Sequence, residues 1–149
     1  MRNRFAALVI LVVAAGVALA AAPSGTQKIV FARVFPNAGQ VGLFIAAADG
    51  SGEHLLLAGS KEIDYDPVWS PDGTSIVFTS DREGSADLFR VKPDGTGLER
   101  LTTNTAYDDQ AAFSPDGKQL VFVTTRAGGR ANLWTMDLQT RRGKALTTG

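Results

Sequence analysis

The feature of this sequence that most limits its fold is an internal repeat of about 44 residues. The segment WSPDG at residues 69–73 returns as FSPDG at residues 113–117, 44 positions later. The apolar runs that follow, at residues 76–79 and 120–123, keep this spacing, and the Leu-Thr pair at residues 101–102 returns 45 positions later. A chain of such units stacks copies of one supersecondary motif instead of folding around a single irregular core.

A third and shorter copy lies before the two complete ones. IVFA at residues 29–32 matches IVFT at residues 76–79, and DGSG at residues 49–52 stands 45 positions before DGTG at residues 94–97. This copy has no counterpart of residues 68–69, which enter the Ser-Pro-Asp-Gly turn of the next copy. We therefore expect an incomplete unit and two complete ones, at residues 29–58, 64–102 and 108–148.

Each complete copy reads as four short strands joined by tight turns. Ser-Pro-Asp-Gly favours a type I turn, because proline presets φ at the second position and aspartate and glycine suit the third and fourth. No segment of the repeat shows the apolar period of an amphipathic helix. The prediction is an all-β chain, with strands in the first complete copy at residues 68–69, 75–80, 87–91 and 98–102.

Four antiparallel strands within a repeat of this length match the size of one β-propeller blade. The three copies predict propeller blades of four antiparallel strands, about two and a half to three blades and eleven strands in all. A closed ring needs at least about four blades, so we expect an open arc or a fragment of a larger propeller. Uncovered end blades also predict self-association of the incomplete propeller.

Several short motifs keep the same order in both complete copies. An aspartate precedes the segment Trp/Phe-Ser-Pro-Asp-Gly. This segment is followed, in order, by an apolar strand, an Asp-Arg or Thr-Arg pair, a strand with an aromatic residue, a polar turn and a Leu-Thr pair. Over residues 29–149 this pattern resembles the TolB-type β-propeller repeat, a WD40-like repeat also called PD40. The resemblance implies a non-enzymatic propeller that takes part in protein complexes of the bacterial envelope. The same repeat type occurs in the non-catalytic propellers of prolyl-oligopeptidase-like serine peptidases.

The N-terminus has the layout of a secretory signal. A basic head at residues 1–4 precedes residues 5–22, which carry no polar side chain, and Ala18-Leu19-Ala20 fits the A-x-A cleavage pattern. We expect a signal peptide at residues 1–20, a linker at residues 21–28 and a periplasmic or secreted protein. The alternative is an uncleaved anchor, the only membrane attachment we expect. With no cysteine in the chain, neither acylation nor a disulfide is expected.

Two oppositely charged pairs recur at one position of the repeat. Asp64 and Arg82 are 18 residues apart, as are Asp108 and Arg126. Because a residue kept in every copy most simply serves the blade itself, we interpret these as structural ion pairs. The alternative is an anion site, since arginine suits bidentate partners.

Blade geometry places the loop before the first strand and the loop after the second on one face. Tyrosine and arginine are the favoured anchors of protein interfaces, and this face carries both among mixed charges. The candidate partner-binding rim consists of Tyr65, Asp66, Arg82, Glu83, Tyr107, Asp109, Arg126 and Arg130.

Motifs for catalysis, metals and nucleotides do not emerge from the sequence. The single histidine, His54, follows a turn in an expected strand, and no serine stands in G-x-S-x-G. No calcium-loop pattern and no dinucleotide fingerprint is present, and the basic cluster at residues 141–144 is too small for nucleic acid. We therefore expect no catalytic residues, cofactor, metal or nucleic-acid partner.

The prediction for function is an exported, non-enzymatic β-propeller module that binds protein or peptide partners, in the manner of a TolB-like periplasmic scaffold. The alternative is an N-terminal, non-catalytic propeller fragment of a prolyl-oligopeptidase-like serine peptidase.

Overall fold

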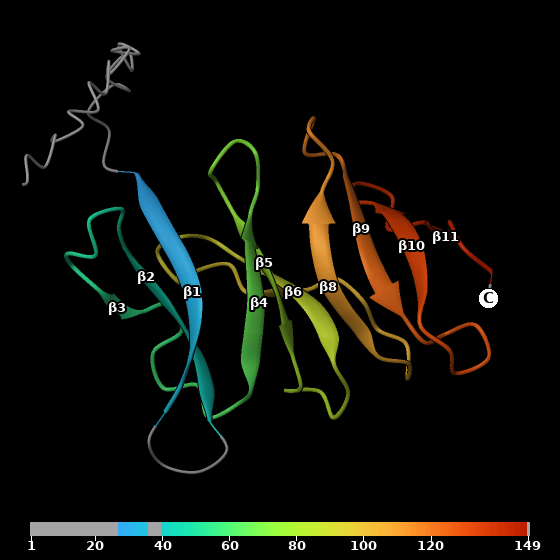
Figure 1. Cartoon of the computed structure of the whole chain (residues 1–149), viewed down its shortest axis with the longest axis horizontal. Helices are drawn as coiled ribbons and strands as arrows, with labels where there is room; N and C mark the ends of the chain where they lie inside the picture. The colour runs from blue at the N-terminus through green and yellow to red at the C-terminus, as the bar shows by residue number, and fades with distance from the viewer. Residues whose placement is uncertain (1–26, 36–39, 149) are drawn as a thin grey trace, which may run out of the picture.

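The computed structural model describes residues 27–35 and 40–148, which form three antiparallel sheets side by side (Figure 1). The predicted signal at residues 1–20 lies outside the described residues. Across the described part of the chain we find no helix at all, and so none long and apolar enough to cross a membrane. The prediction of an all-β chain of propeller blades in an open arc is confirmed.

The three sheets follow the three copies of the repeat. The first has the order β1 (Lys28–Val34), β2 (Val41–Ala47) and β3 (His54–Leu55). The second has β4 (Asp64–Trp69), β5 (Ile76–Ser80), β6 (Asp87–Val91) and β7 (Glu99–Arg100). The third has β8 (Asp108–Phe113), β9 (Gln119–Thr124), β10 (Asn132–Asp137) and β11 (Gly143–Ala145). Each sheet is a meander, so strands adjacent in sequence are adjacent in space.

The first strand of each complete sheet is longer than the sequence predicted. β4 begins at Asp64, which pairs with Ser80, and its register shifts between Tyr65 and Val68. The bulge places Asp66 at a φ of 49°, a left-handed conformation that the equivalent Gln110 shares at 53°. Because a bulge lets pairing continue past an irregular residue, the segment predicted as a loop is part of the strand.

The Ser-Pro-Asp-Gly segments form the expected turns at one end of the sheets. The Gly73 amide donates to the Ser70 carbonyl over 2.9 Å, and Gly117 does the same to Ser114. Gly73 has a φ of 69°, which a side chain would strain. The Ser70 hydroxyl donates to Asp72 Oδ1 over 2.6 Å, so the serine and the aspartate fix each other in the turn.

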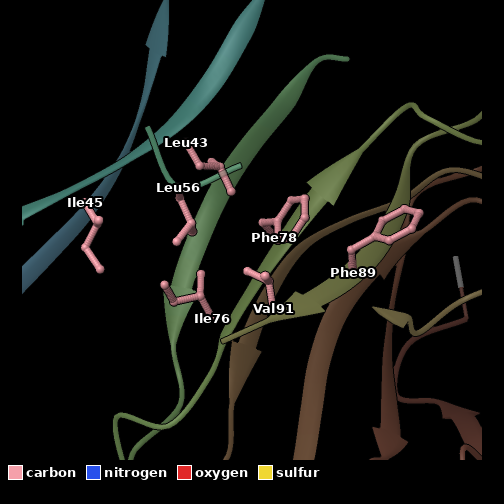
Figure 2. Close-up of a cluster of buried hydrophobic side chains, with 7 residues drawn as sticks. All are labelled: Leu43, Ile45, Leu56, Ile76, Phe78, Phe89 and Val91. Carbon is pink, nitrogen blue, oxygen red and sulfur yellow. The ribbon is translucent and has the colours of Figure 1, made fainter. Parts of the chain in front are cut away.

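β5 is buried on both faces, because its side chains alternate between two neighbouring sheets. Ile76 and Phe78 point toward the first sheet, and Val77 points toward the third. Figure 2 shows the cluster between the first and second sheets, which consists of Leu43, Ile45, Leu56, Ile76, Phe78, Phe89 and Val91. The cluster between the second and third sheets consists of Val77, Leu88, Leu101, Leu120, Phe122 and Met136. The core therefore consists of two layers of apolar side chains, one between the first and second sheets and one between the second and third.

The strand directions gather one set of loops at the end of the sheets opposite the Ser-Pro-Asp-Gly turns. Asp64 opens β4 opposite Ser80, the last residue of β5, and Asp108 opens β8 opposite Thr124, the last residue of β9. The loops that precede β4 and β8 and those that follow β5 and β9 therefore share one edge, which we call the rim.

Candidate partner-binding rim

The rim is built on two nearly identical ion pairs. Arg82 Nη2 lies 2.6 Å from Asp64 Oδ1, and Arg126 Nη2 lies 2.6 Å from Asp108 Oδ2. Both carboxylates are buried, and both arginines are largely covered. Each pair joins the start of a sheet's first strand to the loop after its second strand, and so holds the bulged strand against its neighbour.

Each of these arginines also lies on two aromatic rings. The Arg82 guanidinium carbon is 5.5 Å from the Phe78 ring centroid and 4.9 Å from that of Phe89. Arg82 Nε donates to the Ser80 hydroxyl over 2.9 Å. Arg126 repeats the arrangement over Phe122 and Trp134, with the Thr124 hydroxyl as acceptor. With their charge and donors committed within the blade, the arginines are poorly suited to an external anion.

A second buried polar group explains why Leu-Thr recurs. The Thr102 hydroxyl accepts from the Leu88 amide over 3.0 Å and donates to Asp87 Oδ1 over 3.2 Å. Arg100 pairs with the same carboxylate at 2.7 Å. In the third sheet the Leu133 amide donates to the Thr147 hydroxyl over 2.9 Å. In each sheet the threonine thus satisfies a backbone donor of the third strand just beyond the end of the short fourth strand.

The two tyrosines of the chain line one hollow of about 500 Å³ at the rim, which we call the tyrosine hollow. All three sheets contribute to it: Val41 starts β2, Tyr65 lies in β4, and Tyr107 directly precedes β8. The remaining lining residues are Ile63, Asp81, Gly84, Ser85 and Ala86. Its wall is therefore mostly apolar and aromatic, with Asp81 as its charged member.

Carboxylates surround the phenol of Tyr65. Burial, together with Asp109, Asp66 and Asp81, raises the pKa of Tyr65 to about 12. Burial and the neighbouring Asp109 also raise the pKa of Asp66. Asp109 Oδ1 accepts from the Thr79 hydroxyl over 3.0 Å, which links the third sheet to the second. The hollow therefore combines two phenols with a local excess of negative charge.

Four of the predicted rim residues gather at the hollow, and four do not. Tyr65 and Tyr107 line it, and Asp66 and Asp109 act electrostatically on Tyr65. Of the others, Arg82 and Arg126 lie in the ion pairs, and Glu83 Oε2 is 3.7 Å from Arg100 Nη1. Arg130 is exposed and does not line the hollow.

Neither Asp81 nor the apolar lining of the hollow was among the residues predicted from the sequence. Asp81 stands where the next copy has Thr125, and its carboxylate accepts from the Ile63 amide over 2.9 Å. This difference between the two copies is a sequence signal by which Asp81 could have been identified as a candidate site residue. His54 lies elsewhere, exposed in β3, with Nδ1 2.8 Å from the Gly52 carbonyl oxygen.

We predict that Arg82→Ala destabilises the fold by about 3–5 kcal/mol, because it leaves the buried Asp64 carboxylate without its partner. Arg33→Ala is the matched control. Arg33 also lies over two phenylalanines, but its ion pair with Glu53 is exposed, so its loss should be much smaller. Denaturant unfolding of both variants measures the difference. Unchanged unfolding of the Arg82 variant, with partner binding lost, would make Arg82 a recognition residue.

We predict that Tyr65 titrates with a midpoint near pH 12 in the folded protein. In a Tyr107→Phe variant Tyr65 is the only tyrosine, so the phenolate absorbance reports it alone. In denaturant the midpoint should return to about 10. Because the unfolded phenol ionises first, the free energy of unfolding should fall as pH rises from about 10 toward 12. A folded-state midpoint near 10 would show that Tyr65 is neither buried nor close to carboxylates.

Comparison with known proteins supports the architecture. A "Tol-Pal system protein TolB" from Syntrophus aciditrophicus is 43% identical over 47 residues, which is 32% of this chain and 10% of that protein. The structure of a protein assigned as TolB from Agrobacterium tumefaciens superimposes with a TM-score of 0.72 at 25% identity, covering 81% of this chain and 45% of that one. The chain thus spans less than half of each of these two proteins.

A puromycin-hydrolyzing peptidase from Mycobacterium tuberculosis shares the fold, with a TM-score of 0.59 at 22% identity over 72% of this chain and 18% of that one. The family described as "TolB beta propeller domain" (PD40) matches residues 10–149. The repeat, the blade-like sheets and this match together show that the chain belongs to the TolB β-propeller family.

Proposed function

We propose that this chain is an exported, non-enzymatic β-propeller module that binds a protein or peptide partner at the tyrosine hollow. The observation that carries the proposal is the hollow itself, which draws residues from all three sheets at the rim. Tyrosine offers a large apolar surface with a polar tip at a small entropic cost, and is enriched where proteins bind one another.

The charges around the hollow favour a basic partner. Asp66, Asp81 and Asp109 lie near Tyr65, while Arg82 and Arg126 are held in their own ion pairs. A lysine or arginine of the partner would enter a site of negative potential, and its aliphatic stem would pack on the tyrosine rings. We therefore propose a segment with a basic residue flanked by apolar ones.

Two further observations support a scaffold rather than an enzyme. The only histidine is exposed in β3 and directs Nδ1 to a backbone carbonyl in its own turn. The relatives matched by sequence include several named as Tol-Pal system proteins, and their membership of a named protein system supports a protein partner for this chain as well.

A peptide panel tests the proposed site directly. Peptides with lysine or arginine between apolar residues should bind, and the same peptides with glutamate should not. Tyr65→Ala and Tyr107→Ala should each weaken binding by at least about tenfold. Leu98→Ala is the control, because Leu98 is also exposed but follows the turn at the opposite end of the second sheet. Equal binding by all three variants would place the partner elsewhere.

We propose export because residues 1–20 have the layout of a secretory signal. If this signal is cleaved after Ala20, the mature protein should begin at Ala21. N-terminal sequencing of chain recovered from the periplasm or the medium measures this. Recovery of only membrane-bound chain beginning at Met1 would establish the alternative, a retained anchor.

The fold shared with the puromycin-hydrolyzing peptidase favours a second candidate, the non-catalytic propeller of a serine peptidase. The reading frame beyond the codon for Gly149 separates the two candidates. Further repeats followed by a G-x-S-x-G segment would establish the peptidase, and repeats followed by a stop would favour the scaffold.

A further inference from the structure

A single carboxylate lines the tyrosine hollow, and it belongs to Asp81. Asp81 Oδ1 accepts from the Ile63 amide over 2.9 Å, while Oδ2 has no hydrogen-bond partner among the described residues. The side chain is half-buried, and no lysine or arginine in the described part of the chain forms an ion pair with it. Asp81 therefore carries an unpaired charge at the wall of the hollow.

The third sheet shows which part of this arrangement the fold requires. Thr125 is the counterpart of Asp81 in the next copy, and Tyr107 is the counterpart of Ile63. The Tyr107 amide donates to the Thr125 hydroxyl over 3.1 Å, and the Thr125 amide donates to the Tyr107 carbonyl over 3.0 Å. In the second sheet the Asp81 amide likewise donates to the Ile63 carbonyl, over 3.4 Å. The loop thus needs an acceptor at this position, and a neutral hydroxyl is sufficient.

The charge of Asp81 therefore calls for a reason other than the fold. Withdrawing a charge from water is unfavourable unless the charge is paired. The fully buried carboxylates at this edge follow that rule, because each has an arginine within 2.6 or 2.7 Å; they are Asp64, Asp87 and Asp108. Asp81 departs from the rule, and its open oxygen belongs to a residue that lines the hollow. A cation supplied by a ligand in the hollow would complete the same pairing.

The other carboxylates near Tyr65 are less suited to this role. Asp109 Oδ1 accepts from the Thr79 hydroxyl over 3.0 Å and from the Gln110 amide over 2.7 Å. Asp66 lies at the bulge of β4, and neither Asp66 nor Asp109 lines the hollow. Asp81 is therefore the carboxylate that a side chain inside the hollow can reach.

We propose that Asp81 binds the ammonium group of a lysine in the partner segment, an inference that rests on the proposed function. Asp81 Oδ2 accepts a hydrogen bond from the ammonium, and the aliphatic stem of the lysine packs on Tyr65 and Tyr107. Lysine is favoured over arginine because the Ile63 amide already engages one oxygen of the carboxylate. An ammonium is a point charge that one oxygen can hold, whereas a guanidinium gains most from parallel bonds to two oxygens.

Asp81→Asn tests this assignment, because its amide oxygen can still accept from the Ile63 amide although the charge is lost. The probe is a capped peptide with one lysine between valines and leucines, and calorimetry measures its binding to the full chain. We expect Asp81→Asn to bind it at least about tenfold more weakly than the wild type. Asp81→Thr, which copies the third sheet, should lose as much. Denaturant unfolding of both variants should stay close to that of the wild type.

Glu83→Gln is the matched control. It removes the same charge from the same loop, but Glu83 is exposed and does not line the hollow. Its binding of the lysine peptide should therefore stay within about twofold of the wild type. A loss as large as that of Asp81→Asn would show a general effect of charge and overturn the assignment.

Two further peptides test for direct contact. With glutamine in place of lysine the peptide should bind the wild type about tenfold more weakly, whereas Asp81→Asn should bind the two peptides alike, because the same ion pair is missing in either case. The arginine peptide should bind the wild type more weakly than the lysine peptide. An arginine peptide that binds as tightly would overturn the choice of lysine.

The remaining outcomes separate this inference from the proposed function. If Tyr65→Ala weakens binding of the lysine peptide and Asp81→Asn does not, the hollow remains the site and the role of Asp81 is overturned. Marked destabilisation of both Asp81 variants would overturn it as well, because the charge would then serve the fold. A lysine peptide that does not bind the wild type, or that binds Tyr65→Ala equally well, would overturn the proposed function and this inference together.

Discussion

A sheet of this protein has two apolar faces and can cover neither by itself, and this constraint determines the rest of the structure. β5 shows it most clearly, since Phe78 packs on the first sheet while Val77, the residue before it, packs toward the third. The polar interactions follow from that arrangement. Once both faces are apolar, the charges that hold the strands of one sheet together must sit at their ends, as Arg82 and Asp64 do.

The same constraint shapes the rim. Arg82 and Arg126 lie over the aromatic residues of their sheets and are paired with buried aspartates. Among the described residues no arginine forms an ion pair with the carboxylates near Tyr65, which give the tyrosine hollow its negative character. The binding site proposed at this edge therefore consists of residues that differ between copies, while the shared residues lie in the contacts within the blades.

The sequence was sufficient for the parts of the fold that repeat. The internal repeat located all three sheets and the eleven strands, because turn chemistry and apolar alternation are local. It did not locate the start of β4, since the bulge at Asp66 rests on a left-handed backbone conformation that no glycine marks. It also missed Asp81 and Val41, which meet Tyr65 and Tyr107 only after three sheets stack.

The double burial of β5 also has a consequence for the dynamics of the chain. The amides of the middle sheet lie between two apolar layers, whereas β1 and β11 each have a hydrogen-bonded neighbour on one side only among the described strands. Local unfolding disrupts the fewest packing contacts in a sheet that has an apolar layer on only one of its faces. Amide exchange should therefore slow from both outer sheets toward β5, so that the most persistent structure lies in the middle of the chain rather than at either end.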